Sequence, residues 1–130
     1  MLLKIEFEKE TPIYEQLRNQ IVHGIATGEL NEGESMPSVR QLAADLGINL
    51  HTVNKTYNIL KNEGFLTVHR RKSVIVNSRE AIQKVDISEK LDEKLRPLIA
   101  EAVCRGMDRA DLEKIVGNIH ATIKNDKETR

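Results

Sequence analysis

Residues 37–57 read PSVRQLAADLGINLHTVNKTY, and this stretch predicts two short helices joined by a tight turn. Ser38 can cap the first helix, and Gln41, three positions later, can reach back to it as in a capping box. Gly47 ends that helix, because glycine adopts the left-handed conformation of a turn without steric cost. Asn49 can cap the second helix. Two helices joined in this way form a helix-turn-helix, a motif that places its second helix in the major groove of DNA.

Apolar residues recur at helical spacing in both helices. The stripes are Leu42, Ala43 and Leu46 in the first helix, and Val53, Tyr57 and Leu60 in the second. An ordinary helical hairpin has the same pattern, so the helices alone do not decide for DNA binding. The next residues favour it, because the β-branched and aromatic runs at 65–68 and 74–76 predict two strands with the basic tip HRRKS between them. Such a wing can reach DNA phosphates or the minor groove.

Three segments resemble the GntR family of bacterial transcription regulators, within about residues 10–76. Residues 12–17 (PIYEQL) resemble its opening helix, and residues 33–40 (GESMPSVR) resemble its G-x-x-L-P-S-x-R signature. Residues 49–57 (NLHTVNKTY) resemble the N-P-N-T-V-x-K-A-Y pattern of the YtrA-like subfamily. A short tail after the wing is also typical of that subfamily. The resemblance implies a two-helix dimerisation segment in place of a large effector domain.

The charge distribution agrees with a DNA-binding segment, although the net charge is zero. Residues 1–36 hold three basic and seven acidic residues, residues 37–79 hold seven basic and two acidic, and residues 80–130 hold ten basic and eleven acidic. The positive charge therefore falls on the helix-turn-helix and wing. A mixed surface can also fluctuate by this much.

Length and composition indicate a small cytoplasmic protein. A chain of 130 residues makes one domain, or one domain with an appendage. No apolar run approaches the roughly 20 residues of a membrane span, so no membrane partner is expected. The N-terminus lacks the pattern of a secretory signal. Cys104 is the only cysteine, which excludes an internal disulfide and fits a reducing compartment.

The segments before and after this region also show regular patterns. Residues 2–7 alternate in polarity, which favours a short strand over a mobile arm. Thr11 can cap a helix that has Pro12 at its first position and ends at Gly28. The core stripe of that helix consists of Ile13, Leu17, Ile21 and Ile25. The polar residues 77–87 predict a linker.

Two amphipathic helices make up the tail. The first runs from about Ser88 to Gly106 and contains Pro97, which should bend or split it. Asp108 and Asp111 can cap the second. So small a tail cannot bury both apolar stripes, so we expect a second copy of the chain to cover them in a two-fold dimer. The predicted interface residues are Leu95, Leu98, Ile99, Leu112, Ile115, Val116 and Ile119.

The predicted DNA contacts lie on the helix-turn-helix and the wing tip. His51, Thr52 and Lys55 lie opposite the apolar stripe of the second helix, and Asn54 also points away from the core. The resemblance to the GntR family implies DNA contacts from Arg40, Asn49 and Thr52. The alternative is that these side chains form an ordinary polar helix face that contacts only solvent. The predicted DNA-binding residues are Arg40, Asn49, His51, Thr52, Asn54, Lys55, Arg70, Arg71 and Lys72.

Nothing in the sequence indicates an enzyme, a cofactor or a metal site. The four histidines show no metal-ligand spacing with one another or with Cys104. There is no glycine pattern of a phosphate loop and no serine nucleophile elbow.

The predicted fold is mainly α with a small β-wing. A winged helix-turn-helix domain is expected at residues 1–78 and a two-helix dimerisation segment at residues 79–130. The predicted function is a transcription regulator, a repressor that binds a palindromic operator in double-stranded DNA as a homodimer. A winged-helix protein-interaction module and a sensor that responds to an unidentified small-molecule effector remain the alternatives.

Overall fold

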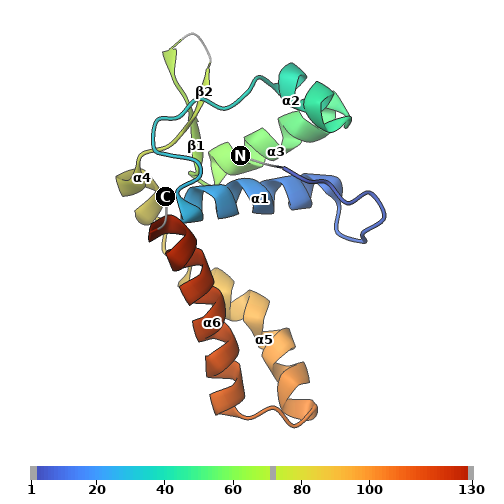
Figure 1. The fold of residues 1–130 in the computed structure, drawn as a ribbon, viewed down its shortest axis with the longest axis vertical. Helices are drawn as coiled ribbons and strands as arrows, with labels where there is room; N and C mark the ends of the chain where they lie inside the picture. Colours follow the sequence, from blue (N-terminus) through green and yellow to red (C-terminus); the bar gives the residue numbers. More distant parts are fainter. Residues whose placement is uncertain (1–2, 71–72, 129–130) are drawn as a thin grey trace.

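A computed structural model describes residues 3–70 and 73–128, and it is mainly helical with a small wing. The elements in chain order are α1 (Ile13–Thr27), α2 (Val39–Leu46), α3 (Leu50–Asn62), β1 (Leu66–Val68), β2 (Val74–Val76), α4 (Arg79–Gln83), α5 (Ser88–Cys104) and α6 (Arg109–Glu128). In Figure 1, α2, α3 and the wing lie on one side of α1, and α5 and α6 extend from the other side as a two-helix arm. The predicted fold class is confirmed. No described helix is long and apolar enough to cross a membrane.

Helices α2 and α3 form the predicted helix-turn-helix. The Ser38 hydroxyl oxygen accepts a hydrogen bond from the Gln41 backbone N–H at 3.1 Å, which caps α2. The Gln41 side chain donates to Asp45 at 2.7 Å, so the predicted capping box forms only by half. Gly47 ends α2 in the left-handed conformation, with φ of 66°. The Asn49 side chain then caps α3.

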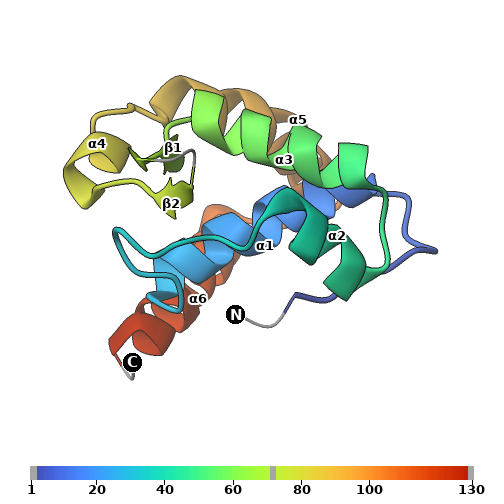
Figure 2. The same cartoon turned by 90° about the horizontal axis from the view of Figure 1, so that it is seen from above.

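The core lies where α1 packs against the helix-turn-helix and the wing, and Figure 2 shows α1 and α3 as neighbours that lie at an angle to each other. Its fully buried side chains include Leu17, Ile21, Val53, Tyr57, Leu60, Leu66 and Val76. Burying one such side chain contributes about 1.5–3 kcal/mol. Burial raises the pKa of Tyr57, so its hydroxyl stays protonated and donates to the Pro37 carbonyl at 2.8 Å. This bond ties α3 to the segment that enters α2.

The wing is a two-stranded antiparallel sheet. Leu66 on β1 faces Val76 on β2, and Val68 faces Val74. Ser35, in the loop before α2, forms a further antiparallel bridge with Ile75. The wing is therefore joined to the helix-turn-helix through backbone hydrogen bonds as well as through the core.

The N-terminal segment departs from the predicted strand. Residues 3–6 belong to no strand, and side-chain amides of α1 instead satisfy backbone groups of Lys4 and Glu6. The Gln20 side chain exchanges two hydrogen bonds with the Lys4 backbone, and the Gln16 side chain does the same with Glu6. Helix α1 also begins one residue later than predicted, because Pro12 is its N-cap and has a non-helical ψ of 147°. The predicted Thr11 cap is therefore wrong.

Two predictions for the second half of the chain also need correction. The expected linker contains the short helix α4, which begins after Ser78 because the serine hydroxyl accepts the Ala81 N–H at 3.1 Å. Helix α5 runs unbroken through Pro97, so of the two expected effects, a bend or a split, the split does not occur. A proline removes one backbone hydrogen bond, and the rest of the helix maintains the ladder. The predicted start of α6 is confirmed, since the Asp108 carboxylate accepts the Asp111 N–H at 2.9 Å.

Candidate nucleic-acid interface

The side of α3 that faces away from the core carries four predicted contact residues. They are His51, Thr52, Asn54 and Lys55. Thr52 is half-buried, and the other three are exposed. Val53 and Tyr57, across the helix, are fully buried. Helix α3 therefore presents polar groups near its N-terminal end, the end that reaches base edges in helix-turn-helix proteins.

Arg40 and Asn49 add polar groups before α3. Arg40 is exposed in the first turn of α2. The Asn49 side-chain oxygen accepts the His51 N–H at 2.8 Å, and its NH2 group has no partner in the described part of the chain. Because an amide carries an acceptor and two donors, Asn49 can cap α3 and still donate to a ligand.

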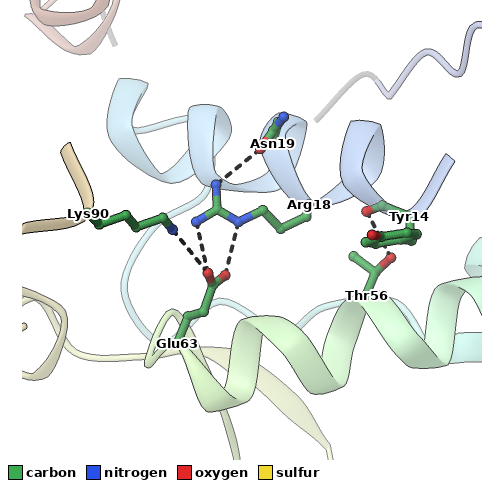
Figure 3. A network of polar contacts seen from close by, with 6 residues as sticks. All are labelled: Tyr14, Arg18, Asn19, Thr56, Glu63 and Lys90. Carbon is green, nitrogen blue, oxygen red and sulfur yellow. Dashed lines mark hydrogen bonds and ion pairs between the residues drawn. The ribbon is translucent and has the colours of Figure 1, made fainter. Parts of the chain in front are cut away.

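Lys55 is held by a residue that the sequence analysis did not assign to the site. Its ammonium nitrogen lies 3.8 Å from the centre of the Tyr14 ring. The first turn of α1, which carries Tyr14, is anchored to α3 because the buried Thr56 hydroxyl donates to the Tyr14 carbonyl at 3.2 Å (Figure 3). A cation above an exposed aromatic face is stabilised by about 0.5–1 kcal/mol. Local sequence patterns do not predict these contacts, because Thr56 lies 42 positions from Tyr14 and Lys55 is its near neighbour on α3.

The wing tip contributes a further basic segment. Arg70 is exposed just after β1, and the Ser73 hydroxyl donates to its carbonyl at 3.3 Å. The His69 N–H donates to the Ser73 carbonyl at 2.7 Å, which closes the loop beyond the strands. Arg71 and Lys72 lie outside the described residues, so the structure does not test their predicted role.

Helices α5 and α6 form a second candidate site, an open apolar groove of about 890 Å³. All seven predicted interface residues line it. In a single chain many of them face solvent, with Leu98 66%, Val116 59% and Ile119 57% exposed. Apolar surface gathered in this way marks an interaction site.

A cluster of charges joins three helices at the base of the arm (Figure 3). Arg18 of α1 donates two hydrogen bonds to the Glu63 carboxylate, at 2.9 and 3.3 Å, and Lys90 of α5 donates a third at 3.3 Å. The Arg18 guanidinium also lies 5.6 Å from the centre of the Phe65 ring. Partial burial raises the pKa of Glu63, but the hydrogen bonds and charges of Arg18 and Lys90 outweigh burial and hold this pKa below its ordinary value.

Comparisons with known proteins agree with this arrangement. The family model of bacterial regulatory proteins, gntR family, matches residues 13–76. The HTH-type transcriptional repressor YtrA of Bacillus subtilis is 29% identical over 127 residues, which cover 97% of this chain and 98% of that protein. The solved structure of YtrA from Sulfolobus acidocaldarius, a GntR-family transcription factor, is 39% identical, with a TM-score of 0.65 over 77% of this chain and 99% of that one. This chain belongs to the GntR family.

The likeness to solved structures extends beyond the helix-turn-helix. The crystal structure of a transcriptional antiterminator from Listeria monocytogenes has a TM-score of 0.82 and 27% identity, and the match covers 95% of this chain and 92% of that chain. The arm formed by α5 and α6 is therefore shared as well.

Membership of the GntR family places this chain among helix-turn-helix transcription regulators, the class predicted from the sequence. Within the described residues, no group of three or more histidine, cysteine or acidic side chains could hold a metal ion. The family model is one of bacterial regulatory proteins.

Proposed function

We propose that this GntR-family protein binds a palindromic operator as a homodimer and represses transcription by occupying it. The observation that carries the proposal is the exposed polar face near the start of α3, opposite a fully buried apolar face. In this proposal residues 1–78 are the DNA-binding domain and residues 79–130 are the dimerisation segment.

The DNA contacts that we propose use each part of the first domain differently. His51, Thr52, Asn54 and Lys55 read base edges from α3, Arg40 and Asn49 add contacts from α2 and from the turn before α3, and Arg70, Arg71 and Lys72 reach phosphates from the wing. Positions 37–79 hold seven basic and two acidic residues, and this positive charge supports phosphate binding. Phosphate contacts position a protein on the duplex, and base contacts give the sequence preference.

A second copy of the chain is the proposed occupant of the groove between α5 and α6. The seven apolar residues that line the groove in one copy can pack against the same seven in the other, so two-fold symmetry counts every contact twice. Each buried side chain contributes about 1.5–3 kcal/mol. A two-fold dimer presents two α3 helices, which suits two half-sites about one turn of DNA apart.

Repression follows from occupancy, since a regulator bound over a promoter blocks polymerase without an activating surface. YtrA of B. subtilis, a relative that this chain matches along almost its full length, is a transcriptional repressor, which supports this direction of control.

Selection of bound sites from random duplex DNA tests the proposal. We expect enrichment of a palindrome, followed by binding that weakens steeply with salt, with a log–log slope of about −0.9 per phosphate contact. An RNA hairpin of the same length is the competitor, because one structural relative is an antiterminator. Failure to enrich any duplex sequence would reject sequence-specific DNA binding and favour a protein-interaction module.

A further inference from the structure

Glu63 lies where α3, the proposed recognition helix, meets the two-helix arm of α5 and α6. It is the C-cap of α3, so it follows the helix whose other end carries the proposed base contacts. Its carboxylate accepts hydrogen bonds from a cation on α1 and a cation on α5, as Figure 3 shows. One side chain thus connects the last turn of α3, the middle of α1 and the first turn of α5.

The two cations hold Glu63 in different ways. The Arg18 and Glu63 side chains are 20% and 28% exposed, and the pair of hydrogen bonds between them fixes the plane of the carboxylate. Lys90 is 49% exposed and approaches the oxygen that Arg18 binds at 3.3 Å. Arg18 therefore orients an acceptor within the DNA-binding part, and Lys90 attaches the arm to it.

We propose that Glu63, through Lys90, is a specificity-determining residue that sets the spacing between the two half-sites of the operator. This inference rests on the proposed function. The arm also packs on α1 through α6, and the Lys90–Glu63 contact adds a direct link from the start of α5 to the end of α3 that restrains the angle between the arm and α3. In a two-fold dimer that angle decides how far apart the two recognition helices lie.

Helix α5 is long enough for a small change of its angle to alter the distance between the two bound half-sites. Helix α5 has 17 residues and is therefore about 25 Å long, at roughly 1.5 Å per residue. A tilt of about 10° at its base moves its far end by about 4 Å, which exceeds the rise of about 3.4 Å per base pair. A loosened attachment should thus broaden the accepted spacing by about one base pair in either direction.

The test compares spacer preference among variants of the full-length chain. Fluorescence anisotropy measures affinity for a single half-site and for two half-sites whose spacer varies one base pair at a time. We expect the parent to prefer one spacer by about tenfold over its neighbours, and Lys90→Gln and Glu63→Gln to reduce that preference to about threefold or less, because mismatched geometry lowers the effective concentration of the second half-site. Lys90→Arg keeps the contact and should keep the preference.

Matched controls separate positioning from charge and from folding. Arg96→Gln removes a cation from α5 whose carboxylate partner, Asp92, lies on the same helix, so the spacer profile should not change. Lys90→Gln and Glu63→Gln change the net charge in opposite directions, so a purely electrostatic role would shift half-site affinity in opposite directions. A positioning role broadens the spacer profile in both variants and leaves half-site affinity within about twofold.

The outcomes distinguish this inference from the function on which it rests. If the parent binds no operator, the proposed function fails. If the parent binds a palindrome but both variants retain its spacer preference, the assignment of Glu63 is overturned. Lys90 is an exposed residue, so Lys90→Gln remains informative even if Glu63→Gln destabilises the fold.

Discussion

At the scale of single residues, the candidate site depends on contacts between residues far apart in the chain. The exposed polar face of α3 was predictable because His51, Lys55 and their neighbours alternate with a buried stripe at helical period. The roles of Tyr14 and Glu63 were not predictable, because their partners lie 42 and 45 positions away. Local patterns show which face of a helix is polar, but they do not show which polar groups meet after folding.

The proposed base contacts on the polar face of α3 can be tested by mutation. Replacing Thr52 and Lys55 together by alanine should weaken operator binding by about 1–3 kcal/mol for each base contact that the change removes. Lys55 is exposed, and the Thr52 group that bonds to Thr56 is its backbone carbonyl, so the loss of stability should not exceed the roughly 0.5–1 kcal/mol of the Lys55–Tyr14 contact. Anisotropy titration against the selected operator measures the weakening. Lys114→Ala on α6 is the control for charge, and equal affinities of the double variant and this control would exclude the two residues from the interface.

The charge cluster at Glu63 predicts a pH-dependent stability. The pKa of Glu63 is lower in the folded chain than in the unfolded one, so its ion pairs stabilise the fold above the unfolded-state pKa. This stabilisation is lost as the pH falls through the folded-state pKa. Glu63→Gln should therefore lower the free energy of unfolding by up to about 1 kcal/mol at neutral pH. The difference should shrink below about pH 4.

Urea denaturation at a series of pH values measures this difference. Glu101→Gln provides the matched control, because Glu101 pairs with Arg105 on an exposed face of α5 and should contribute little. A destabilisation by Glu63→Gln that stays constant from pH 7 to pH 3 would show that the carboxylate charge is not its source.

At the scale of elements, local signals predicted the helix-turn-helix and wing well and the flanking segments less well. Ser38, Gly47 and Asn49 end or begin their helices where their side chains or backbone preferences require. The N-terminal segment shows what alternation leaves open. Leu3 and Ile5 do turn toward the core while Lys4 and Glu6 face solvent, as a strand would place them. Alternation indicates the buried side, but it does not indicate whether a strand or glutamine side chains will satisfy the backbone.

The wing can be tested as a unit through its salt dependence. Replacing Arg70, Arg71 and Lys72 by serine should lower affinity for every DNA sequence. It should also reduce the log–log salt slope by about 0.9 for each phosphate that the wing no longer neutralises. The matched control replaces Lys94, Lys114 and Lys124 on the arm by serine, which removes the same charge. If both triple variants have the same salt slope, the wing does not contact DNA phosphates directly and acts only through long-range electrostatic attraction.

At the scale of the whole molecule, the arm leaves an apolar face that one chain cannot cover. The sequence predicted this, because two stripes on two helices exceed what so small a tail can bury. Leu98→Glu places a charge in the groove, where a second copy would have to bury it, and should give a monomer with weaker operator binding. Sedimentation at micromolar concentration measures the assembly.

Val103→Glu is the matched control on the same helix. Val103 is 61% exposed and does not line the groove, so this variant should still dimerise. If Leu98→Glu also remained a dimer, the interface would lie elsewhere, and α1 and the N-terminal segment would be the next surfaces to test.

The open groove has a consequence for the cell as well as for the fold. If the operator binds only the dimer and most of the protein is monomeric, operator occupancy rises with the square of the protein concentration. A small change in synthesis or degradation would then switch the controlled promoter over a narrow range of copy number. Cell division halves the pool only if partitioning is even, so daughters that inherit unequal shares would differ more in promoter activity than in protein content.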